Sequence, residues 1–152
     1  MARAPSPKRW TVERMQDEVS QFARQRMGHG LQIIRVEDGL IFEHRNASHF
    51  LAEIDLRATK ITVPVTAEFR DHPEYDEDEL VERGLEAIAP SLEKYRQRGY
   101  EVRETEFQPA YNAPVHGEAD VPIFIAFVER HLEGKEELLD ELPWLLEQLP
   151  TK

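Results

Sequence analysis

The sequence predicts one two-layer α+β domain, in which helices cover a single face of an antiparallel sheet. Its 152 residues are about the size of a single domain. Apolar and polar residues alternate across much of 31–69, which is typical of strands, and the flanking segments repeat apolar residues every three to four positions, which is typical of helices. The predicted order is one helix, a four-strand meander, a second helix, a later hairpin and a closing helix, α-ββββ-α-ββ-α.

The first ten residues are expected to lie outside this domain, which spans residues 11–150. They carry Arg3, Lys8 and Arg9, no acidic residue and two prolines, a composition typical of a disordered basic leader. They also lack the apolar stretch of a secretory signal, so a cytoplasmic location is expected.

The first helix is predicted over residues 12–27. Thr11 is a favourable N-cap residue, and Gly28 and Gly30 end the helix. One apolar stripe follows from the spacing of Val12, Met15, Val19, Phe22, Ala23 and Met27.

A meander of four short strands is predicted next. Asp38-Gly39 is a strong hairpin signal between the first two strands, and turns at 46–48 and 58–60 separate the others. The fourth strand, 61–70, contains Pro64, which lacks an N–H donor. The strand is therefore expected to be an edge, or to be bulged, at Pro64.

The second half of the chain is predicted to contain a helix, a hairpin and a closing helix. The acidic run 76–79 opens the middle helix, which Pro90 should kink or split. Strands are expected at 100–107 and 123–128, with a long loop at 108–122 between them, and a helical turn is the alternative for 123–128. Leucine spacing predicts the closing helix over 135–149, where Pro143 is expected to begin a second short helical piece.

The net charge of −11 narrows the classes of partner. Such acidity repels phosphate backbones and anionic lipids, so neither nucleic acid nor membrane is the expected partner. No apolar run approaches the roughly 18 residues of a membrane span. The chain has no cysteine, which excludes disulfides and cysteine-ligated metal sites. Neither a metal nor an organic cofactor is predicted.

The element order, small size and acidity over residues 11–149 resemble the secretion-chaperone-like fold of the type III secretion chaperones and the related YbjN-like proteins. This resemblance implies a homodimeric protein that binds partner polypeptides without catalysis. Four strands precede the middle helix here, whereas three are expected in that family, and Pro90 lies within the helix that would form the dimer.

Two surfaces are predicted to bind the partner polypeptide. The closing helix presents leucines and a tryptophan that serve either as core or as an interface anchor. The outer part of the fourth strand could accept an added strand. The candidate partner-binding residues are Leu138, Leu142, Trp144, Leu145, Leu149, Val63 and Val65.

Three weaker candidates involve titratable side chains. His44 and His49, with nearby carboxylates, could hold a metal or simply flank a turn. The acidic run 71–79 lacks the central glycine of a calcium loop and is better explained as a helix start. His116 and Glu118, on the 108–122 loop, could form an acid–base pair.

The leading hypothesis is a non-enzymatic, cytoplasmic chaperone or adaptor that holds a partner polypeptide. The alternatives are an acidic immunity-type inhibitor of a basic toxin, which the charge of −11 suggests, and a small enzyme that uses His116 and Glu118. The net charge would favour a basic partner.

Overall fold

The computed structural model describes residues 10–45, 49–68, 77–111 and 121–149. Within these ranges the chain has the predicted α+β order. The elements are α1 (Val12–Met27), a 3-10 turn η1 (Gly28–Gly30), β1 (Leu31–Val36), β2 (Gly39–His44), β3 (His49–Asp55), β4 (Lys60–Glu68), α2 (Glu77–Gln97), β5 (Glu101–Tyr111), β6 (Val121–His131) and α3 (Lys135–Gln148).

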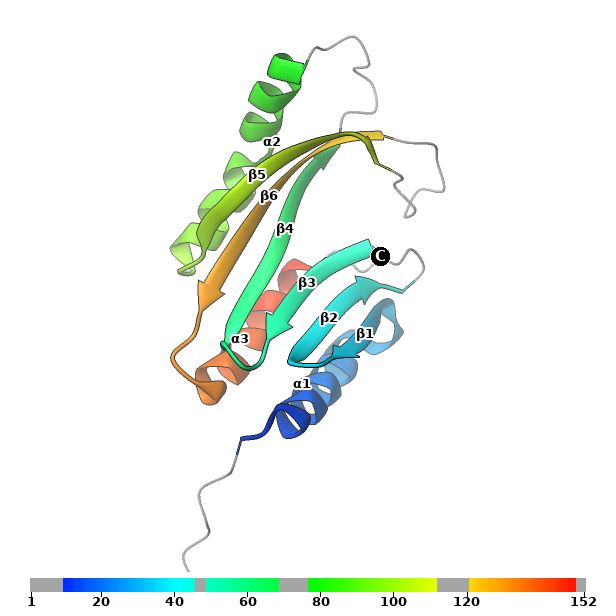
Figure 1. Cartoon of the computed structure of the whole chain (residues 1–152), viewed down its shortest axis with the longest axis vertical. Helices are drawn as coiled ribbons and strands as arrows, with labels where there is room; N and C mark the ends of the chain where they lie inside the picture. The colour runs from blue at the N-terminus through cyan, green and yellow to red at the C-terminus, as the bar shows by residue number, and fades with distance from the viewer. Residues whose placement is uncertain (1–9, 46–48, 69–76, 112–120, 150–152) are drawn as a thin grey trace, which may run out of the picture.

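The six strands form one open antiparallel sheet in the spatial order β1-β2-β3-β4-β6-β5. All three helices lie against the same face of the sheet, α1 and α3 behind the β1 half and α2 behind the β5 half (Figure 1). The two-layer architecture with one covered face, predicted from the sequence, is therefore confirmed.

Helix α1 begins and ends at the predicted residues for the predicted reasons. The hydroxyl of Thr11 accepts a hydrogen bond from the backbone N–H of Arg14 at 3.1 Å. Gly28, with φ of 61°, takes the left-handed conformation that ends the helix. The side-chain amide of Gln16 donates to the carbonyls of Val36 and Gly39 at 2.7 and 3.0 Å. This contact fixes α1 beneath the β1–β2 hairpin.

The predicted hairpin is present, but its turn is formed by Glu37 and Asp38, and Gly39 is the first residue of β2, where it has another role. A Cβ at Gly39 would lie 2.0 Å from the carbonyl oxygen of Ile54 in β3, so only glycine allows this close approach of the strands. Further along, the β2–β3 register shifts after Phe42, which pairs with Ala52 while Glu43 pairs with Phe50. This bulge leaves Leu51 without a partner, and its side chain joins the core.

Strand β4 is an edge on one side at Pro64, as predicted. It pairs with β6 along its full length, but its ladder with β3 ends at the pair Glu53–Thr62. Beyond Thr62 the two strands diverge (Figure 1). No described strand therefore borders the β3-facing side of 63–68, and the missing N–H of Pro64 is tolerated there.

The prolines do not divide the helices that contain them. Helix α2 continues through Pro90 and α3 through Pro143, so a split at either site is wrong, while a kink at Pro90 stays a prediction. Each proline removes one backbone hydrogen bond from its helix. The flanking buried residues, Ile88 and Leu92 in α2 and Leu142 and Leu145 in α3, continue to pack against the core and offset that loss.

The late hairpin is longer than predicted. Strand β5 runs to Tyr111 and β6 begins at Val121, so both ends of the expected 108–122 loop belong to strands. The prolines and the glycine of this segment favoured a loop, but antiparallel pairing with β5, which ends at the pair Tyr111–Val121, extends β6 beyond Pro122. The register shifts between Val102 and Glu104 and between Gln108 and Tyr111, which lets β5 follow the curved sheet.

Candidate functional site

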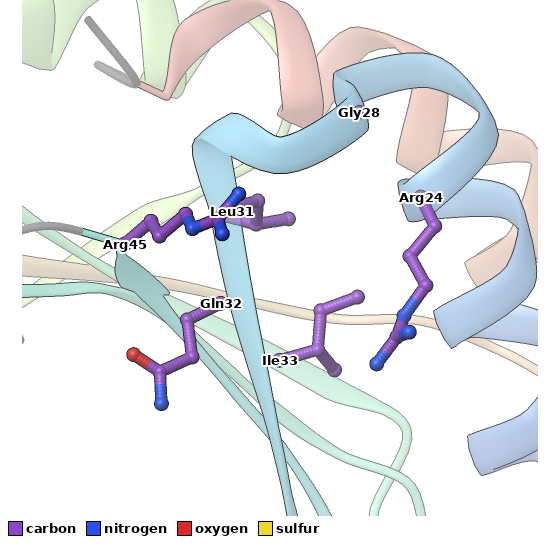
Figure 2. Close-up of a pocket in the computed structure, with 6 residues that line it drawn as sticks. All are labelled: Arg24, Gly28, Leu31, Gln32, Ile33 and Arg45. Atoms are coloured by element: carbon purple, nitrogen blue, oxygen red, sulfur yellow. The ribbon is translucent and has the colours of Figure 1, made fainter.

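An open groove lies between the end of α1 and the edge strand β1. Its larger part has a volume of about 560 Å³ and is lined by Arg24, Gly28, Leu31, Gln32, Ile33 and Arg45. In Figure 2 the side chains of Arg24 and Ile33 point toward each other from α1 and β1, and that of Gln32 points to the other side of the strand. The groove therefore has an apolar floor with arginines on its walls.

A second, smaller part of about 390 Å³ continues the groove toward the hairpin. It is lined by Asp17, Ser20, Gln21, Arg24, Gln25 and Arg35. Arg24 lines both parts, so its side chain borders each of them. Below, the term α1–β1 groove denotes these two cavities together.

The backbone of β1 is open on the side next to this groove. In a two-residue hairpin the residues flanking the turn, here Val36 and Gly39, form a hydrogen-bonded pair, and such pairs alternate along the ladder. The N–H and C=O groups of Leu31, Ile33 and Arg35 consequently point away from β2. Because β1 ends the sheet, no described strand pairs with them. The same three residues line the α1–β1 groove.

The two outer strands of the sheet differ in how well they resist pairing with another chain. Strand β5 carries Glu101, Arg103, Glu104 and Glu106 and two register shifts, which are common protections of an edge. Strand β1, LQIIRV, pairs with β2 in six consecutive pairs without a shift. Its first four residues carry no charge. The β1 edge is thus regular, and Arg35 is its one charged residue.

Arginines surround the groove although the chain is strongly acidic. Arg35 pairs with Asp17 across it at 2.7 Å. On α1 itself, Arg14 pairs with Glu18 and Arg26 with Glu147. Within the described ranges, Arg24 forms no such ion pair, and its side chain is exposed. The hydroxyl of Ser20, buried in the wall beside it, also has no described hydrogen-bond partner.

The predicted residues of the closing helix lie in the core of the chain itself. Leu138, Leu142 and Leu145 are 0% exposed, and Leu149 is also buried. Trp144 is partly buried and packs against the rings of Tyr95 and Tyr100, with centroids 5.4 and 5.9 Å away. A partner could reach the four leucines only if α3 detached, whereas Trp144 is partly accessible. Their role in binding stays a prediction.

Val63 and Val65 are also buried, at 3% and 8% exposure, on the face that the helices cover. The feature that β4 offers to a partner is its backbone. From Val63 to Glu68 its β3-facing side has no described neighbour. Strand addition there stays a prediction, made through main-chain groups rather than through these valines.

The titratable candidates lie only partly within the described residues. His44 and His49 are register partners across β2 and β3, and His44 is buried among core residues. Among the described residues no three His, Asp or Glu side chains lie where they could hold a metal ion. His116 and Glu118, and the acidic run up to Asp76, lie outside the described residues.

The most buried charge belongs to a network that links elements rather than to a pocket. Glu141 of α3, with a side chain 1% exposed, accepts hydrogen bonds from Arg98 at 2.7 Å and from Arg130 at 2.6 Å. Burial raises the pKa of Tyr95 to about 12. Burial, with a contribution from the charge of Glu141, raises the pKa of Tyr100 further. These groups join α3 to neighbouring elements, and none of them lines either part of the α1–β1 groove.

Sequence reasoning missed the α1–β1 groove because its walls come from separate segments. Arg24, Arg35 and Arg45 are evenly spread along the chain and form no motif. The sequence offered one signal for the groove, which is the presence of four arginines within residues 24–45 of a chain whose net charge is −11.

Comparison with protein-family models, with curated proteins and with solved structures gives no match for this chain. Among the helices of the described ranges, none combines the length and the apolar composition that a bilayer-spanning segment requires.

Proposed function

We propose that this chain is a non-enzymatic, cytoplasmic binding protein of the chaperone or adaptor type, which holds an extended segment of a partner polypeptide as a strand added to β1. The observation that carries the proposal is the position of the α1–β1 groove. It runs along an unprotected strand edge whose free N–H and C=O groups belong to residues that also line the groove.

Strand addition satisfies the chemistry of both parts of this site. The outward-facing N–H and C=O groups of Ile33 and Arg35 and the carbonyl of Leu31 would gain partners, each worth about 0.5–1.5 kcal/mol net. Alternate side chains of the bound segment would point toward α1 and cover the apolar floor formed by Leu31 and Ile33. Main-chain pairing gives affinity with little sequence preference, which suits a chaperone or adaptor.

The proposal predicts that proline at position 33 abolishes binding. The N–H of Ile33 faces away from β2, so Ile33→Pro removes a donor to the added strand and leaves the β1–β2 ladder intact. Ile33→Ala removes the same side chain but keeps the donor, and is the matched control. We expect a capped hexapeptide of alternating valine and threonine to shift the amide resonances of β1 in the wild type and in Ile33→Ala, but not in Ile33→Pro.

Two results would contradict this function. The first is equal binding to Ile33→Pro and Ile33→Ala, with both variants folded by circular dichroism. The second is a dimeric wild type and a monomeric Ile33→Pro in sedimentation velocity, because a second copy of the chain would then occupy the β1 edge. Peptide-induced shifts on β4 instead of β1 would move the site to the other open edge.

A further inference from the structure

We infer that the segment held at β1 is acidic and carries a carboxylate side chain that pairs with Arg24, between apolar side chains that lie on the groove floor. This inference rests on the proposed function and specifies its partner. The inferred partner segment is acidic, whereas the net charge of the chain alone suggests a basic partner.

The geometry of an added strand places its side chains on both sides of Arg24. Side chains at positions i and i+2 lie on the same face, about 6.6–6.8 Å apart. Those that face α1 enter the groove, whose larger part lies over Leu31 and Ile33 and whose smaller part lies beside Arg35. Arg24 lines both parts, so a side chain between the two would meet its guanidinium.

The charges of the groove favour a carboxylate at that point. A guanidinium binds a carboxylate through two parallel hydrogen bonds. Arg35 already pairs with Asp17, whereas Arg24 has no ion pair within the described ranges although the other arginines of α1 do. Elsewhere the acidic surface repels an acidic peptide, so the arginines around the groove would direct it to this edge.

The test compares three capped hexapeptides of alternating valine and threonine that carry Glu, Gln or Lys at one central position. Their affinities are measured by resonance shifts at low and at physiological salt. We expect the Glu peptide to bind the wild type at least about tenfold more tightly than the Lys peptide, with the Gln peptide between them. The difference should shrink as salt rises.

The variants Arg24→Gln and Arg96→Gln assign the preference to one side chain. Both remove one exposed positive charge, but Arg96 lies on α2 and lines neither part of the groove. We expect Arg24→Gln to reduce the Glu-over-Lys preference to about twofold or less, and Arg96→Gln to leave it unchanged.

The failure of this inference can be distinguished from the failure of the proposed function. Equal affinities for the three peptides, with binding still abolished by Ile33→Pro, would overturn the acidic partner and leave strand addition intact. A preference for the Lys peptide, or a loss of preference in Arg96→Gln as large as in Arg24→Gln, would also overturn it. If none of the peptides binds, both proposals are wrong.

Discussion

Glu141 shows how strongly one residue can depend on its neighbours. Its side chain is 1% exposed, and a buried carboxylate is tolerated only when it is paired. Arg98 at the end of α2 and Arg130 on β6 donate to its two oxygens, and Arg130 also reaches Glu137 at 3.1 Å. This one side chain therefore joins α2, β6 and α3.

We expect Glu141→Gln to lower the free energy of unfolding by about 2–3 kcal/mol. Breaking a buried pair costs about 3–5 kcal/mol, and the cost here is smaller because Arg98 is 43% exposed and can turn to solvent. The matched control is Glu147→Gln, whose pair with Arg26 is 3.3 Å long and exposed, and which should cost less than about 1 kcal/mol. Urea unfolding followed by circular dichroism measures both, and equal costs would contradict the structural role of Glu141.

Among the elements, α2 lies unusually close to the sheet because of Gly84. A Cβ there would lie 2.5 Å from Cγ of Phe124 on β6, and Phe124 is 1% exposed. Glycine is unfavourable within a helix by about 1 kcal/mol relative to alanine. Its presence in the middle of α2 is explained by this contact.

This close contact determines whether Gly84→Ala stabilises or destabilises the protein. If propensity alone acted, Gly84→Ala would stabilise the protein by about 1 kcal/mol. We expect it to destabilise by about 1–3 kcal/mol instead, since the added methyl group forces α2 away from Phe124. Ala87→Gly, on the exposed side of the same helix, isolates propensity and should cost about 1 kcal/mol. A higher melting temperature for Gly84→Ala would disprove the close contact.

The sequence predicted best those elements whose boundaries are set by residues close to them in the chain. Thr11 and Gly28 bound α1, and a tight turn joins β1 to β2 within one residue of the predicted position, because each effect acts within a few residues. The predictions of a split helix at Pro90 and of a loop at both ends of 108–122 were wrong, because packing and strand pairing with distant residues override local preference. The candidate groove required the placement of α1 against β1, which no local pattern encodes.

At the scale of the whole molecule, the fold combines a protected half and an open half. The β5 end of the sheet is charged and bulged, whereas the β1 end is regular and apolar. Proteins usually protect such edges, since they pair with other chains. The open β1 edge of this acidic molecule is therefore the feature that best supports the proposed binding role.

The stability of the whole molecule should fall steeply in alkali because of its buried tyrosines. In the unfolded chain a tyrosine ionises near pH 10, whereas burial raises the pKa of Tyr95 to about 12. Between these values the unfolded state binds fewer protons than the folded state, so the free energy of unfolding decreases as pH rises. The contribution of Tyr95 is present below pH 10 and is lost by about pH 12.

The variant Tyr95→Phe separates this effect from the general repulsion of an acidic chain. It removes the ionisable group and keeps the ring that packs against Tyr100 and Trp144. We expect it to weaken the loss of stability at pH 11.5 by about 2 kcal/mol, because a pKa shift of about two corresponds to about 3 kcal/mol, most of which is lost by that pH. Lys135, whose pKa is lowered by burial, acts in the opposite direction and is unchanged by the variant. Denaturant unfolding at pH 8, 10 and 11.5 measures the difference; parallel losses in both proteins would show that Tyr95 ionises without opening the core.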